Sequence, residues 1–99
     1  MKHSNVIMTR NAAELAEVLG LTPSDAVEIE IRSDLNDKII EVAKKKRLTH
    51  EQVATLAHTS RTRITAIMNR NIGELSTDLL LRVLGSLGVH ASIHFKKAA

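Results

Sequence analysis

Apolar residues recur every three or four positions along most of the chain, which is the period of an amphipathic helix. This period predicts five helices, at residues 11–19, 23–46, 50–57, 61–68 and 77–87. At the end of the chain the period changes to two, and Val89, Ala91, Ile93 and Phe95 fall on one face. The pattern therefore predicts a mainly α chain that ends in one half-buried β-strand.

Capping signals mark where the helices begin and end. Asn11 and Glu14 have the spacing of a capping box, and the sequence Thr22-Pro23-Ser24-Asp25 combines a cap, a first-turn proline and an acid near the helix start. Gly20 and Gly88 follow the first and the last helix, as glycine commonly does at helix ends. We therefore expect the second helix to begin near Thr22 and the last to end at Gly88.

The stretch Val27–Arg32 is compatible with two structures. Its apolar and charged residues alternate as in a strand, yet Val27 and Ile31 also fall at helical spacing. If the stretch is a strand, Ser33 caps a shorter helix over residues 34–46. We favour the helix and keep the strand as the alternative.

Length and composition favour one domain with an aliphatic core. The chain has 99 residues, of which 43% are apolar, and its single aromatic residue is Phe95. A chain of this length forms one modest core. We expect a single domain over residues 1–99, made of an N-terminal extension (1–32), a helical core (34–87) and the strand (89–96).

Cysteine is absent, which excludes disulfides, thiolate nucleophiles and cysteine-based zinc sites. No apolar run approaches the roughly 20 residues of a membrane helix, and residues 1–10 lack the apolar segment of a signal peptide. We expect a cytoplasmic protein without membrane contact, associated with the nucleoid when it is bound to DNA.

Charge is divided unevenly between the two parts of the chain. Residues 1–43 carry four basic and eight acidic groups, whereas residues 44–99 carry ten basic and three acidic groups. A basic half on a small chain suits a polyanionic partner, because each Lys or Arg placed on a phosphate releases counterions. The acidic half offers a separate contact surface, and a solvated basic face is the plain alternative.

The segment Thr49–Asn69 has the pattern of two short helices that cross closely. Small or branched apolar residues recur at the contact positions, namely Val53, Ala54, Ala57, Ile64 and Ile67. Thr49 with Gln52 forms a capping box for the first helix, and Ser60 caps the second. This spacing predicts a helix-turn-helix.

The segment resembles the Cro/CI-like (Xre) helix-turn-helix family, over Asp34–Leu87 in all and most closely over Thr49–Asn69. The whole layout is similar to short HigA-like antitoxins, in which endings like Leu75–Leu84 and Leu87–Val89 are familiar. The resemblance implies a compact lambda-repressor-like bundle. Two residues depart from the family pattern: His50 replaces a phosphate-binding Gln, and His58 replaces a turn Gly, where a positive backbone angle is needed.

The resemblance implies that the second helix enters the major groove of duplex DNA with its N-terminal residues toward the base edges. Arg61 or Arg63 then pairs with guanine, while Thr62 and Thr65 touch a thymine methyl or a phosphate. The DNA-binding residues that we expect are Thr49, His50, Ser60, Arg61, Thr62, Arg63, Thr65, Asn69 and Arg70.

A homodimer is expected, because such domains read operators as two-fold pairs. The candidate interface joins the apolar helix Leu79, Leu80, Val83, Leu84 and Leu87 to the segment Val89–Phe95. The function that follows is a sequence-specific transcriptional regulator of the repressor type. The resemblance adds the role of an antitoxin that represses its own operon together with a cognate toxin.

The alternative is a protein-interaction module whose helix-turn-helix is only a scaffold and whose acidic residues 1–43 bind a basic partner such as a toxin. We expect no catalysis and no cofactor, because the sequence has no glycine-rich phosphate loop and no paired carboxylates with a nearby histidine. His90 and His94 share a strand face but lack a third ligand, so we expect no metal site. The basic run Lys44–Arg47 fits a helix end better than a phosphate site.

Overall fold

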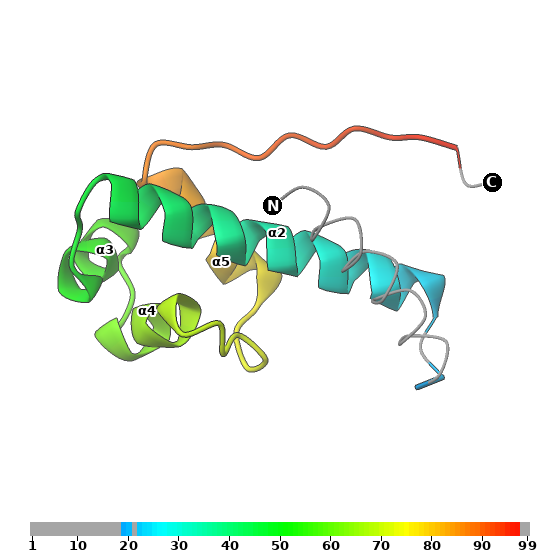
Figure 1. Cartoon of the computed structure of the whole chain (residues 1–99), viewed down its shortest axis with the longest axis horizontal. Coiled ribbons are helices and arrows are strands. Elements are labelled where there is room, and N and C mark those ends of the chain that lie inside the picture. The colour runs from blue at the N-terminus through cyan, green and yellow to red at the C-terminus, as the bar shows by residue number, and fades with distance from the viewer. Residues whose placement is uncertain (1–18, 21, 98–99) are drawn as a thin grey trace. The chain divides into compact units, whose positions relative to one another are not determined.

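The computed structural model describes residues 19, 20 and 22–97. Within them lie four helices, α2 (Pro23–Lys45), α3 (His50–Ala57), α4 (Arg61–Met68) and α5 (Thr77–Ser86) (Figure 1). Their bounds agree with the helical period within one or two residues. The helix expected at residues 11–19 lies outside the described residues except for Leu19, which is part of a turn.

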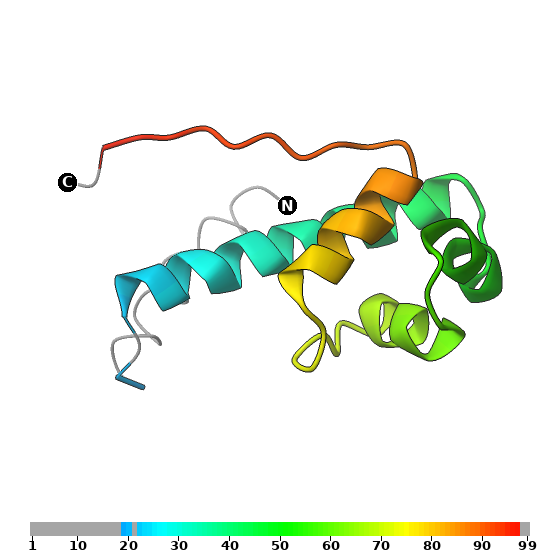
Figure 2. The ribbon, with the colours of Figure 1, turned by 180° about the vertical axis from the view of Figure 1, so that it is seen from behind.

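The expected C-terminal strand is wrong. Residues 89–97 run as an extended, mostly exposed segment, and the described part of the chain holds no β-strand (Figure 2). A strand needs a neighbour to pair its backbone N–H and C=O groups, and the described residues offer none. The fold class is corrected from five helices with a strand to a helical fold with four described helices.

The chain divides into two compact units at Asp34 and Leu35, within α2. In the described part of the first unit, Val27–Arg32 is helical, which decides between the two structures compatible with its sequence. Thr22 caps this half: its hydroxyl accepts from the Asp25 N–H at 3.1 Å and its N–H donates to the Asp25 carboxylate at 2.9 Å. The Thr22 backbone N–H, and then its hydroxyl, lower the pKa of Asp25.

The second unit, residues 35–99, contains the core. Helices α3, α4 and α5 gather about the C-terminal half of α2 (Figures 1 and 2). The core is aliphatic, as expected, and consists of Leu35, Ile39, Val42, Ala43, Val53, Ala54, Ala57, Ile64, Ile67, Leu79, Leu80, Val83, Leu84 and Leu87. Phe95 takes no part in it, because 92% of its surface is exposed.

The apolar residues of α5 do not form a dimer face. All five that we assigned to the candidate interface, Leu79, Leu80, Val83, Leu84 and Leu87, are buried in the core of their own chain. These five aliphatic residues of α5 and its C-cap help to close a core that has no large aromatic side chains. Only Leu81 leaves substantial apolar surface on this helix.

All four described helices end in the same way. In each, an N–H just beyond the helix donates to a carbonyl five residues earlier: Leu48 to Ala43, Thr59 to Ala54, Asn71 to Ala66 and Val89 to Leu84. This Schellman ending needs a left-handed residue, which is Arg47, His58, Arg70 and Gly88 in turn. The positive backbone angle expected at His58 is confirmed, with φ of 54°.

Candidate nucleic-acid interface

Helices α3 and α4 form the crossed pair predicted from Thr49–Asn69. Val53, Ala54 and Ala57 of α3 are buried in one cluster with Ile64 and Ile67 of α4. The small side chains of Ala54 and Ala57 allow close approach of the two helices. Left-handed His58 then turns the chain between them within three residues, from His58 to Ser60.

Both predicted caps are present. The Thr49 hydroxyl accepts from the Gln52 N–H at 3.1 Å, and the Thr49 N–H donates to the Gln52 side chain at 2.8 Å. The Ser60 hydroxyl accepts from the Arg63 N–H at 3.2 Å at the start of α4. These bonds fix the first turns of α3 and α4, where the family resemblance places DNA contacts.

Helix α4 has one buried and one exposed side. Ile64 and Ile67 are completely buried, whereas Arg61, Thr62 and Arg63 are exposed at its N-terminal end. Thr65 is half-buried, and Ser60 and Asn69 at the two caps are exposed. Of the side chains predicted to touch DNA, Arg61, Thr62, Arg63 and Thr65 belong to α4, and Ser60 and Asn69 cap it. Arg70 follows the helix, and Thr49 and His50 precede and begin α3.

His50 connects the start of α3 to the middle of α4. Its Nδ1 lies 3.0 Å from the Thr65 hydroxyl, and both side chains are half-buried. Sequence reasoning assigned both residues to DNA but not to each other, because a contact between residues fifteen positions apart depends on how the helices cross. The bond orients both side chains at the base of the outer side of α4.

The C-terminal end of α4 is held from α2. The buried Asn36 side chain donates to the Ile67 carbonyl at 2.8 Å, and the Asp37 carboxylate pairs with the Arg70 guanidinium. Sequence reasoning missed Asn36 and Asp37. The sequence signal that could have indicated Asn36 is its position: a polar residue lies one helical turn before the apolar Ile40, on the same side of the helix.

Residues 18–96 match the model of a helix-turn-helix domain family. The chain belongs to this family of helix-turn-helix domains. No curated protein and no solved structure matches the chain. The family match supports a DNA-binding regulator, and it includes the extended segment after Gly88. The narrower resemblance to the Cro/CI-like and HigA-like proteins stays a prediction.

In this helix-turn-helix domain Arg63 has neighbours of both charges. Its guanidinium donates to the Thr59 hydroxyl at 3.4 Å. It also lines a hollow of about 390 Å³ together with Glu74, Asp78 and Arg82. Arg63 therefore lies in a mixed electrostatic setting that sequence spacing did not indicate.

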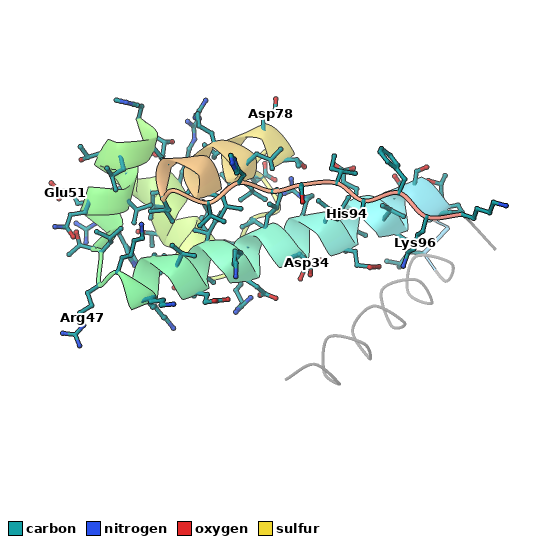
Figure 3. The ribbon with its side chains drawn as sticks, turned by 90° about the horizontal axis from the view of Figure 1, so that it is seen from above. Asp34, Arg47, Glu51, Asp78, His94 and Lys96 are labelled. Carbon is teal, nitrogen blue, oxygen red and sulfur yellow. The ribbon has the colours of Figure 1, made fainter. Side chains whose placement is uncertain are left out.

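One residue of the basic run Lys44–Arg47 makes a hydrogen bond to another helix of the domain. The Lys46 ammonium donates to the Leu87 carbonyl at 2.8 Å, at the C-terminal end of α5. Lys44 and Lys45 lie in the last turn of α2, where cations offset the helix dipole, and Arg47 projects outward beyond it (Figure 3). Lys44 and Lys45 thus lie where the helix-end interpretation places them, whereas Lys46 contacts the end of a different helix.

Neither a cluster of candidate metal ligands nor a membrane-spanning helix occurs among the described residues of the domain. No group of three or more His, Asp or Glu side chains there is arranged to hold a metal ion, and His94 lies on the exposed C-terminal segment (Figure 3). None of the described helices is both long and apolar enough to cross a membrane.

Proposed function

We propose that this helix-turn-helix protein is a sequence-specific transcriptional repressor that binds duplex DNA as a homodimer, with α4 in the major groove. The observation that carries the proposal is the two-sided character of α4. Ile64 and Ile67 fix it in the core, while its capped N-terminal turn presents Arg61, Thr62 and Arg63 to solvent. The family match supports the DNA-binding part of the proposal.

The side chains divide into two roles. Arg61 or Arg63 donates to O6 and N7 of guanine, and Thr62 packs its methyl against thymine. Thr49, His50, Ser60, Thr65 and Asn69 contact phosphates at the edges of the groove and set the register of α4 on the duplex. Arg70 is left out of this set because Asp37 holds its guanidinium.

The homodimer would place two α4 helices about 34–36 Å apart, one turn of DNA. Because α5 is committed to its own core, the contact between copies is assigned to the C-terminal segment. Ile93 and Phe95 there are 77% and 92% exposed, which favours a covering partner. A repressor of this kind blocks transcription by occupying promoter DNA.

A second candidate function, binding of a basic protein such as a cognate toxin, is favoured by one observation. Val27, Ile29 and Ile31 are exposed apolar residues on the first half of α2, beside the acidic Glu28 and Glu30. Such a surface suits a partner that offers apolar contacts within a basic rim. Together with autorepression, this would make the protein an antitoxin.

The experiment is a fluorescence-anisotropy titration with duplex DNA from the protein's own promoter region and with random duplex DNA, at about 50 and 200 mM salt. Arg61→Ala/Arg63→Ala is compared with Lys44→Ala/Lys45→Ala, which also removes two positive charges but lies at the end of α2. The control separates the loss of base contacts from the loss of general attraction to DNA.

We expect tight, salt-sensitive binding to the promoter duplex, a loss of at least about tenfold in the arginine variant, and a smaller, sequence-independent loss in the lysine variant. Equal losses in the two variants would reject base reading by α4. Absence of preferred binding by the unaltered protein would reject the repressor at that promoter and leave the protein-binding role as the better candidate.

A further inference from the structure

Two consecutive residues of α2 hold the end of α4. Among the described residues, Asn36 is the one polar residue that is buried, with 3% of its surface exposed. Its Nδ2 donates to the Ile67 carbonyl at 2.8 Å. Asp37 follows it and pairs with Arg70, the left-handed residue that ends α4. We call Asn36, Asp37 and Arg70 the α4 anchor.

The α4 anchor acts on the hydrogen bonds that close the helix. The Ile67 carbonyl accepts from Asn36 and also from the Arg70 N–H at 3.0 Å. A buried amide without an acceptor is costly, so any sliding of α4 that breaks the Asn36 bond is opposed. The side chain of Arg70 is held at the same place by Asp37. Three bonds thus meet at one end of an eight-residue helix.

The other half of α4 is held by a different helix. His50 of α3 contacts Thr65, and the turn after α3 supplies the cap Ser60. Helix α4 is therefore positioned from two sides, by α3 near its middle and by α2 at its end. A helix this short turns as a unit, so a shift at Ile67 also displaces Arg61 and Thr62 at its N-terminal end.

Base contacts and phosphate contacts respond differently to such a displacement. A bidentate contact to a base edge requires a fixed donor geometry, whereas a Lys or Arg reaches a phosphate from many positions. Disturbing the α4 anchor should therefore reduce discrimination between sequences more than it reduces attraction to DNA in general.

We propose that Asn36 and Asp37 are positioning residues for sequence discrimination. Asn36 fixes the axial position of α4. Asp37 pairs with the Arg70 guanidinium and so keeps it from binding a DNA phosphate. The inference rests on the proposed DNA-reading function and extends it to two residues of α2, outside the crossed pair of α3 and α4.

Asn36 is tested with Asn36→Leu, which keeps the branching of the side chain at Cγ, is larger, and removes the donor. Val42→Ala is the matched control, since Val42 is a core residue of α2 outside the α4 anchor. The readout is the ratio of affinities for the duplex that the unaltered protein selects from a random pool and for random duplex DNA. The ratio is measured under conditions in which circular dichroism shows that each variant is folded.

We expect Asn36→Leu to lower this ratio about tenfold, the value of one base contact, with affinity for random DNA within about twofold of the unaltered protein. Val42→Ala should keep the ratio even if it melts at a lower temperature. An unchanged ratio in Asn36→Leu, or an equal fall in Val42→Ala, would overturn the role of Asn36. If Asn36→Leu does not fold, Asn36→Ala takes its place.

Asp37 is tested with Asp37→Asn, a surface substitution that releases Arg70, against Asp34→Asn, which removes the same charge one turn earlier on α2. We expect Asp37→Asn to bind random DNA more tightly and to steepen the salt dependence of log affinity by about 0.9, one added phosphate contact. Asp37→Asn/Arg70→Ala should reverse the change.

Identical salt slopes for Asp37→Asn and Asp34→Asn would overturn the role of Asp37. The unaltered protein distinguishes failure of the inference from failure of the proposed function. If it selects no sequence from the random pool, DNA reading itself fails and the inference falls with it. If it selects a sequence and the α2 variants select it equally well, only the inference fails.

Discussion

The two halves of α2 have similar numbers of large apolar residues but opposite environments. In the first half Val27, Ile29 and Ile31 are 44–56% exposed. In the second half Leu35, Ile39 and Val42 are buried in the core. The boundary between the two compact units falls between these halves, although the helix continues through it.

The difference shows that the number of apolar residues does not decide which part of a helix becomes core. Helical spacing alone does not decide it either, because Val27 and Ile31 precede Leu35 and Ile39 at the same four-residue steps. Residues two positions apart lie on nearly opposite sides of a helix, so Ile29 points away from the side shared by Val27 and Ile31. In the second half, the buried residues fall three and four positions apart and form one stripe. The buried residues of the second half belong to one cluster with residues of α3, α4 and α5.

The halves therefore depend on different stabilising interactions. The first half has its helical backbone bonds and the Thr22–Asp25 cap, which are local. The second half adds burial against three other helices and the hydrogen bond from Asn36 to α4. Substitutions that remove packing should lower the stability of the protein only in the second half. Substitutions that remove local interactions should lower it in both halves.

The largest expected effect is a loss of core packing in the second half. Ile39→Ala should lower the free energy of unfolding by about 2–5 kcal/mol, because Ile39 is completely buried. Ile29→Ala is the matched control on the same helix. It should change the free energy of unfolding by less than about 0.5 kcal/mol, because Ile29 is exposed and alanine has the higher helix propensity. Urea unfolding followed by circular dichroism measures both, and similar losses would contradict the contrast between the halves.

A smaller effect of opposite sign is expected where α2 ends. Arg47 has a φ of 55°, a left-handed backbone conformation that is energetically unfavourable for residues with a Cβ but not for glycine. Arg47→Gly should raise the free energy of unfolding by about 0.5–1 kcal/mol, after allowance for the greater freedom of glycine in the unfolded chain. A lower midpoint of urea unfolding than in the unaltered protein would show that Arg47 contributes more through its side chain than it loses in its backbone.

A still smaller effect is expected at the exposed side of the second half. Lys38 and Glu41 form an ion pair at 3.4 Å, and their side chains are about half exposed or more. Glu41→Gln should lower the free energy of unfolding by less than about 0.5 kcal/mol, and salt should reduce this difference further. A loss comparable to that of Ile39→Ala would mean that charge and not packing secures this half.

The smallest effect is confined to the start of the first half. Thr22 lowers the pKa of Asp25, so the cap is fully formed above the ordinary Asp pKa of about 3.9 and is lost as the pH falls through the lowered value. In an NMR titration the Asp25 amide should shift with a midpoint below 3.9, while amides around Ile39 stay unchanged there. A midpoint at or above 3.9 would contradict the cap.

Local features of this fold could be predicted from the sequence. The caps Thr49 and Ser60, the left-handed turn at His58 and the bounds of α3 to α5 depend on residues a few positions apart. The same is true of the outward position of Arg61, Thr62 and Arg63, which follows from the inward position of Ile64 and Ile67. The predicted DNA-contacting residues are therefore placed largely by helical period.

Features that depend on distant partners could not be predicted. Period two suggested a strand at residues 89–96, but strand formation requires a neighbouring strand. The leucines of α5 were assigned to a dimer because an amphipathic pattern does not say which partner it packs against. The bond from Asn36 to Ile67 joins residues 31 positions apart, and only the packing of α2 on α4 reveals it.

The most direct test of DNA reading by α4 is an NMR titration of the ¹⁵N-labelled protein with a duplex from its own promoter region. The account predicts that the largest changes in amide chemical shift fall on Thr49, His50 and residues 60–65, with little change at residues 23–34. Changes centred on residues 23–34, with α4 unaffected, would contradict the account and place the nucleic-acid contact on the exposed half of α2.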